Sequence, residues 1–102
     1  MVKVNIIRNN NIITNVEILG HAMYEKKGLD IVCASISATV ITTINGIIKL
    51  NKNYIEYESN NKGMVINILK NNNIVNSLIN NMIDLLKELS INYPKNIEIK
   101  EC

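Results

Sequence analysis

The residues of this chain best suited to chemistry are its single histidine, His21, and the first of its two cysteines, Cys33. A cysteine thiolate attacks carbonyl carbons, and a neighbouring imidazole can hold the thiol proton and return it to a leaving group. The pair therefore indicates nucleophilic hydrolysis by a Cys/His dyad. The second cysteine, Cys102, is expected to be frayed and has no part in this hypothesis.

The dyad needs a strand and a helix to position it. A strand predicted to end at Gly20 delivers His21 to an edge of a sheet, and Asp30 is predicted to be the N-cap of an uncharged helical run. Cys33 would then lie in the first helical turn, where backbone N–H groups lack an intrahelical partner. Such a position lowers a cysteine pKa from about 8.5 to roughly 3.5–7.5, and an imidazolium at His21 would lower it further.

Each of these residues also has a structural interpretation. A cysteine in an apolar helix is most often a small buried side chain, a lone histidine at a strand end is more often structural than catalytic, and Asp30 is expected to cap the helix rather than to orient His21. Other chemistry is disfavoured. One histidine and one cysteine do not make a four-ligand zinc site, no GxSxG elbow is present, and Cys33 has no CxxC partner. We therefore predict no metal and no other cofactor.

A distinctive run at residues 20–38 reads GHAMYEKKGLDIVCASISA. Its characteristic elements are Gly20-His21-Ala22, Gly28, Asp30-Ile31-Val32-Cys33-Ala34 and Ser37-Ala38. This arrangement resembles the signature of the ribosomal-processing cysteine proteases, the Prp family. It departs from that signature at Met23, where a small residue is expected, and at Ser35, where alanine is expected.

The resemblance implies a small single-domain protease, residues 1–102, in which His21 and Cys33 are the catalytic pair. It also implies a substrate and an assembly. The substrate would be a large-subunit ribosomal protein with an N-terminal extension, cleaved just after an aromatic residue, and the enzyme would be a homodimer.

Residues 22–29 are predicted to form a polar loop between the strand and the helix. This loop is either an ordinary solvated connection or a flap over a peptide substrate, in which case Met23, Tyr24 and Gly28 belong to the substrate loop. Tyr54 and Tyr57 on a later predicted strand either line a peptide groove or pack against the core.

Composition limits the remaining possibilities. A chain of 102 residues with 47% hydrophobic and 20% charged residues is an ordinary single domain. The net charge of +2 and the lack of a basic cluster with interleaved aromatics give no reason to expect nucleic-acid binding. The first ten residues have no signal-peptide pattern, so a cytoplasmic protein without a disulfide framework is expected.

Residues 31–48 carry no charge, and about 18 such residues is the minimum length for a membrane-spanning helix. The serine, threonine, asparagine and glycine within this run make it only weakly apolar. We therefore interpret it as a core helix and expect no contact with a membrane.

The periodicities predict the fold. Alternation predicts strands at residues 2–6, 12–19, 51–59, 64–70 and 97–100, and apolar residues three or four apart predict helices at 31–50 and 73–90. Thr14, Val16 and Ile18 are expected on one face of the second strand. The order ββα-ββ-αβ indicates an α+β domain, with two helices on one face of a mostly antiparallel sheet.

A second function remains open from the sequence. A non-catalytic ribosome-associated binding module would use Cys33 only for packing, and an inert, slowly alkylated Cys33 would favour it.

Overall fold

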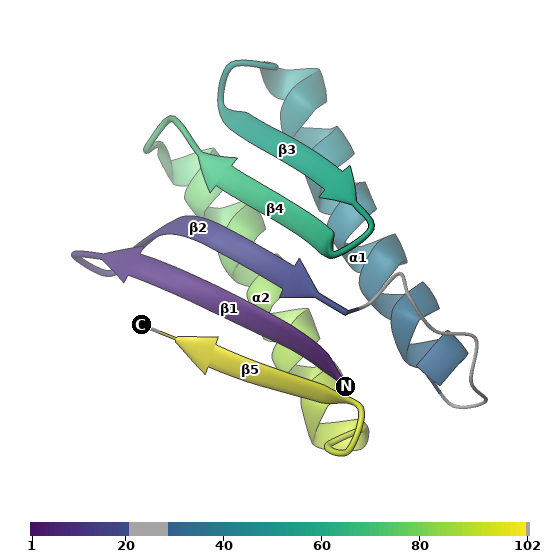
Figure 1. The fold of residues 1–102 in the computed structure, drawn as a ribbon. Helices are drawn as coiled ribbons and strands as arrows, with labels where there is room; N and C mark the ends of the chain where they lie inside the picture. The colour runs from purple at the N-terminus through teal and green to yellow at the C-terminus, as the bar shows by residue number, and fades with distance from the viewer. Residues whose placement is uncertain (21–28, 102) are drawn as a thin grey trace.

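The computed structural model describes residues 1–20 and 29–101 and confirms the predicted α+β architecture. The elements in chain order are β1 (Val2–Asn9), β2 (Ile12–Leu19), α1 (Leu29–Leu50), β3 (Ile55–Asn60), β4 (Gly63–Ile68), α2 (Asn73–Asn92) and β5 (Ile97–Glu101). The five strands form one sheet in the order β3-β4-β2-β1-β5, and both helices cover the same face of it (Figure 1).

The sheet is mixed, with a single parallel pairing. Adjacent strands are antiparallel except β1 and β5, where Val2 pairs with Ile97. The β1–β2 hairpin turns through Asn10 and Asn11, both with positive φ. Asparagine tolerates this backbone conformation better than most residues, which explains why an asparagine run can close the hairpin.

A bulge in the β1–β2 hairpin corrects one predicted face. The pairing shifts between Ile7 and Arg8, so Ile13 turns into the core and Thr14 does not. The Thr14 hydroxyl instead donates to the Ile7 carbonyl oxygen, at 3.3 Å. The predicted placement of Thr14 beside Val16 and Ile18 was therefore wrong, because one extra residue in a strand reverses the alternation beyond it.

The third strand is shorter than predicted. It begins at Ile55 rather than at residue 51, because Asn51 forms a turn. The Asn51 side chain accepts from the Asn53 amide at 2.8 Å, and its carbonyl accepts from the Tyr54 amide at 3.1 Å. These local bonds compete with the strand ladder.

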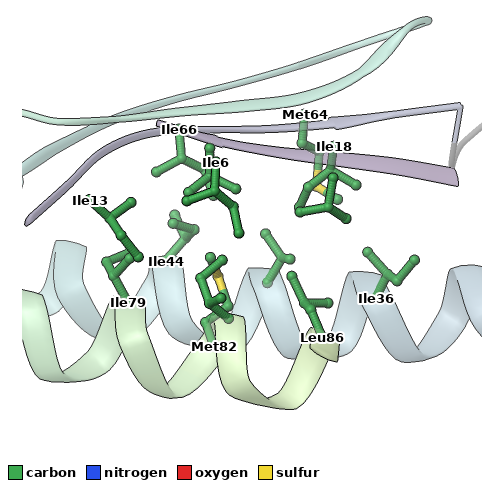
Figure 2. Close-up of a cluster of buried hydrophobic side chains, with 14 of the residues drawn as sticks. Ile6, Ile13, Ile18, Ile36, Ile44, Met64, Ile66, Ile79, Met82 and Leu86 are labelled. Carbon is green, nitrogen blue, oxygen red and sulfur yellow. The ribbon is translucent and has the colours of Figure 1, made fainter. Parts of the chain in front are cut away.

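The core lies between the sheet and the two helices (Figure 2). The predicted stripe of α1 is confirmed, since all five of its members are buried: Val32, Ile36, Val40, Ile44 and Ile47. From α2 the buried side chains are Val75, Ile79, Met82, Ile83 and Leu86. The sequence offers Asn72 or Asn73 as the cap of α2, and Asn72 is the one that caps it, by accepting from the Val75 amide at 2.9 Å.

Helix α1 carries more apolar surface than the core uses. By length and composition, Ile31–Leu50 could cross a membrane. One side of α1 is packed under the sheet, as in a core helix, but Ile31, Ile41 and Ile48 are exposed on its other side.

Candidate active site

The nucleophile candidate Cys33 lies near the start of α1, but not where the capping pattern predicted. Helix α1 begins at Leu29, so Asp30 is its second residue and not its N-cap. The prediction for Asp30 as a cap was wrong because the backbone is already helical at Leu29, and a sequence signal defines a helix start only to within one or two residues.

This shift changes which backbone amides are free. The four N–H groups without an intrahelical acceptor are those of the N-cap and of the first three helical residues, which in α1 are residues 29–31. Cys33 lies beyond them, where a helix N–H already donates to the carbonyl four residues before it. Donors for an oxyanion near Cys33 therefore come from the turn that precedes it, at the positive end of the helix.

Cys33 is neither fully buried nor fully exposed. Its side chain is half-buried and packs against the hydrophobic core, while Val32 and Ile36 on either side are fully buried. Ser37, one turn later, is also half-buried. Cys33 is thus packed against the core in part and is partly exposed to solvent, which is compatible with a role as nucleophile.

Ser35 departs from the expected alanine without harm to the helix. Its hydroxyl donates to the Ile31 carbonyl oxygen at 2.8 Å. The additional polar group is therefore satisfied within α1.

The segment with the other predicted site residues is only partly described. His21, Met23, Tyr24 and Gly28 lie outside the described residues. Gly20, which immediately precedes His21, directly follows β2, and this end of β2 lies at the same end of the molecule as the start of α1 (Figure 1). The topology therefore brings the two chain segments that carry the dyad to one end of the domain.

Gly20 itself is tightly constrained. Its φ of +84° is unfavourable for residues with a side chain, and a Cβ here would lie 3.1 Å from the carbonyl oxygen of Met1. Its amide donates to the Lys62 carbonyl oxygen at 2.9 Å. No local sequence pattern indicates these contacts, because Met1 and Lys62 are distant from Gly20 along the chain.

The tyrosines and the charged groups have structural surroundings. Tyr54 and Tyr57 are half-buried and pack against the core. Glu101 is the last residue of β5, and this end of β5 lies at the opposite end of the sheet from the start of α1 (Figure 1). Its carboxylate forms ion pairs with Arg8 at 3.1 Å and with Lys87 at 3.2 Å. The hydrogen bond from Arg8 has the largest effect on the pKa of this carboxyl and lowers it, and the hydrogen bond from Lys87 lowers it further. Among the residues that the structure describes, no group of three His, Cys, Asp or Glu side chains could hold a metal ion.

Comparison with known proteins identifies the family. Residues 1–98 match the family described as cysteine protease Prp. The chain belongs to this family. It is accordingly a cysteine protease, which makes Cys33, half-buried near the start of α1, the natural nucleophile candidate.

Solved structures agree with this assignment. The essential ribosomal processing protease Prp from S. aureus, in complex with a substrate peptide, is similar with a TM-score of 0.91 and 27% identity over 100% of both chains. The same protease with a covalently linked product peptide gives 0.88 and 27%, again over 100% of both chains. A protein from Streptococcus mutans gives 0.84 and 26%, over 99% of this chain and 93% of that one. A search of curated proteins finds no match.

Proposed function

We propose that this Prp-family protease removes the N-terminal extension of a large-subunit ribosomal protein, cleaving after an aromatic residue, with Cys33 as nucleophile and His21 as general base. The observation that carries the proposal is the half-buried Cys33 near the positive end of α1, in a fold that matches a ribosomal processing protease over its whole length. The S. aureus protease forms a covalent link with a product peptide, which supports nucleophilic chemistry in this fold.

The reaction is the transfer of an acyl group to the thiol and then to water. His21 takes the proton of Cys33, and the Sγ atom attacks the carbonyl carbon of the scissile peptide bond. Amides in the turn preceding Cys33 donate to the resulting oxyanion. The C–N bond then breaks as His21 returns the proton to the leaving amine, which leaves a thioester.

Water completes the cycle. His21 takes a proton from the water, whose oxygen attacks the thioester carbon; the C–S bond breaks, and His21 returns the proton to the Sγ atom. The products are a carboxylic acid on the released extension, which ionises to the carboxylate, and a free thiol at Cys33. The loop that contains Met23, Tyr24 and Gly28 connects the two dyad residues, and we assign it to substrate contact.

The deciding experiment mixes the purified protein with the N-terminally extended ribosomal protein of the same organism and follows the substrate by mass spectrometry. The unmodified enzyme should release one short peptide, and Cys33→Ala and His21→Ala should each release none. Cys33→Ala removes one sulfur from a half-buried site, so its circular dichroism spectrum should match that of the unmodified protein. Cleavage by Cys33→Ala would refute the dyad.

The same samples test the binding-module alternative. Iodoacetamide should alkylate Cys33 faster in the unmodified protein than in His21→Ala at neutral pH. An uncut substrate together with a slowly alkylated Cys33 would refute the protease reaction and favour the non-catalytic module.

We also propose that the protein is a homodimer that buries the exposed side of α1. Ile41 and Ile48 are 42% and 40% exposed on this uncharged surface, which supports burial against a second copy. Replacing both by lysine should produce monomers in analytical ultracentrifugation. Ile7→Lys is the matched control, because Ile7 is 43% exposed on the opposite face of the sheet. A dimer that survives the double substitution would refute this interface.

A further inference from the structure

The corner of the sheet where β2 ends is held by the turn between β3 and β4. Figure 1 shows this turn and the end of β2 at the same end of the sheet. The Lys62 carbonyl oxygen accepts the Gly20 amide at 2.9 Å, and Gly20 is the last described residue before His21. The position of the Lys62 carbonyl therefore determines where the backbone leaves the sheet.

The side chain of Asn60 stabilises this turn. The Asn60 side-chain oxygen accepts the Lys62 amide at 2.8 Å, across a two-residue connection in which Asn60 pairs with Gly63. An asparagine that bonds the backbone two residues ahead stabilises a turn in one conformation. The Lys62 N–H that Asn60 binds and the Lys62 carbonyl that binds Gly20 belong to the two peptide units on either side of the Lys62 Cα, so holding the first limits the positions that the second can take.

Gly63 leaves this corner little freedom to adjust. It pairs with Leu19 of β2, and a Cβ on it would collide with the Ile18 carbonyl oxygen. The strands therefore approach each other at Gly63 as closely as a residue without a side chain permits. Within this close contact the turn between β3 and β4 and the end of β2 move together.

We propose that Asn60 is a positioning residue for the protease reaction, acting through Lys62 and Gly20 on the backbone that enters His21. The inference rests on the proposed role of His21 as general base. A displacement of about 1 Å in a reacting group can cost on the order of a hundredfold in rate, so a turn remote from the nucleophile can influence turnover.

The chain contains a matched control for this residue. Asn51 makes the same kind of bond, in which its side-chain oxygen accepts the Asn53 amide at 2.8 Å, and both asparagines are exposed. Asn51 lies beyond the far end of α1, away from Gly20. Asn60→Ala and Asn51→Ala therefore remove equivalent bonds and should lower the urea midpoint by similar amounts.

Only the change at Asn60 should affect catalysis. In Asn60→Ala we expect kcat to fall roughly threefold to tenfold, the population change that loss of one hydrogen bond allows, with KM within about twofold of the unmodified value. The Gly20 amide should exchange faster with solvent in a two-dimensional NMR experiment. Asn60→Asp should restore both quantities because a carboxylate also accepts from the Lys62 amide. Asn51→Ala should change neither.

The outcomes separate this inference from the proposed function. If the unmodified protein cleaves and His21→Ala does not, while Asn60→Ala cleaves at the unmodified rate, the positioning role is refuted and the dyad stands. Equal losses of kcat in Asn60→Ala and Asn51→Ala would also refute it, because general destabilisation would then explain the effect. If the unmodified protein does not cleave, the proposed function fails. An unchanged rate of hydrogen exchange at the Gly20 amide in Asn60→Ala refutes the link between the turn and Gly20, whether or not the protein cleaves.

Discussion

Replacing Gly63 with alanine should destabilise the protein far more than an average substitution. The new Cβ would overlap the Ile18 carbonyl oxygen and lie 2.9 Å from its carbon and 3.1 Å from the Leu19 Cα. All three atoms belong to the backbone of β2, so no side-chain rotation relieves the overlap. The φ of +142° adds strain, because residues with a side chain rarely adopt it.

The cost has two parts. An unfavourable backbone conformation costs on the order of 1–3 kcal/mol. Moving β4 away from β2 at the Leu19–Gly63 pair weakens about two hydrogen bonds, each of about 1 kcal/mol. The free energy of unfolding should therefore fall by about 3–5 kcal/mol, a large part of the roughly 5–15 kcal/mol that a domain has.

Urea unfolding followed by circular dichroism measures this loss. For an m-value of about 1–3 kcal/mol per molar urea, the midpoint should fall by roughly 1–5 M. Gly46→Ala is the control: Gly46 is exposed in α1 with no atom within 4 Å of an added Cβ, so helix propensity should raise stability by about 0.5–1 kcal/mol. A Gly63→Ala variant within 1 kcal/mol of the unmodified protein would refute the crowding argument.

Two further substitutions test the helix cap and the ion pairs. Asn72→Ala removes the acceptor for the Val75 amide and should lower the free energy of unfolding by about 1 kcal/mol in the same urea assay, with Asn72→Asp close to the unmodified protein. Glu101→Gln should be less stable than the unmodified protein at pH 7, because Arg8 and Lys87 lower the pKa of the Glu101 carboxyl in the folded protein. The ionised carboxylate therefore stabilises the fold above its ordinary pKa of 4.5, and this stability is lost as the pH falls through the lowered pKa. Urea midpoints measured over a pH series should converge in acid, and a constant difference between the two proteins would contradict this assignment.

The elements with strong local patterns were predictable from the sequence. The apolar stripe of α1 has a helical period and is buried as expected, even though many of its residues, such as Val32 and Ile36, are β-branched. The stripe predicted for α2 is buried only in part, because Leu85, which was expected within it, is exposed and Ile83 is buried instead. Asn72 could be predicted as a cap because an asparagine directly preceding a periodic run is the usual helix-start signal. In each case the deciding interaction lies within a few residues of the pattern.

The predictions failed where two local backbone conformations differ little in free energy. The strand alternation gave no sign of the bulge that moves Ile13 into the core in place of Thr14. The start of α1 differed because helical backbone at Leu29 competes closely with a cap at Asp30.

Residue types supplied candidates for the site but not the contacts that support it. His21 and Cys33 were proposed from a motif, the family match agrees with the resemblance that this motif carries, and the roles of the two residues stay predictions. The contacts of Gly20 with Met1 and Lys62 depend on strand pairing between distant segments, which no local pattern reveals.

The parallel pairing of β1 with β5 gives the fold a temporal order. During synthesis the β1–β2 hairpin emerges early, whereas its outer neighbour β5 is the last strand to leave the ribosome. Until then the Val2 amide lacks its acceptor, the Asn96 carbonyl oxygen. The Met1 carbonyl, which lies beside Gly20, is in the same peptide unit as the Val2 amide, so this unit is not yet held from the side of β5. The corner at Gly20 is therefore completed late, and we expect a nascent chain, or one clipped before β5, to hold this corner less firmly.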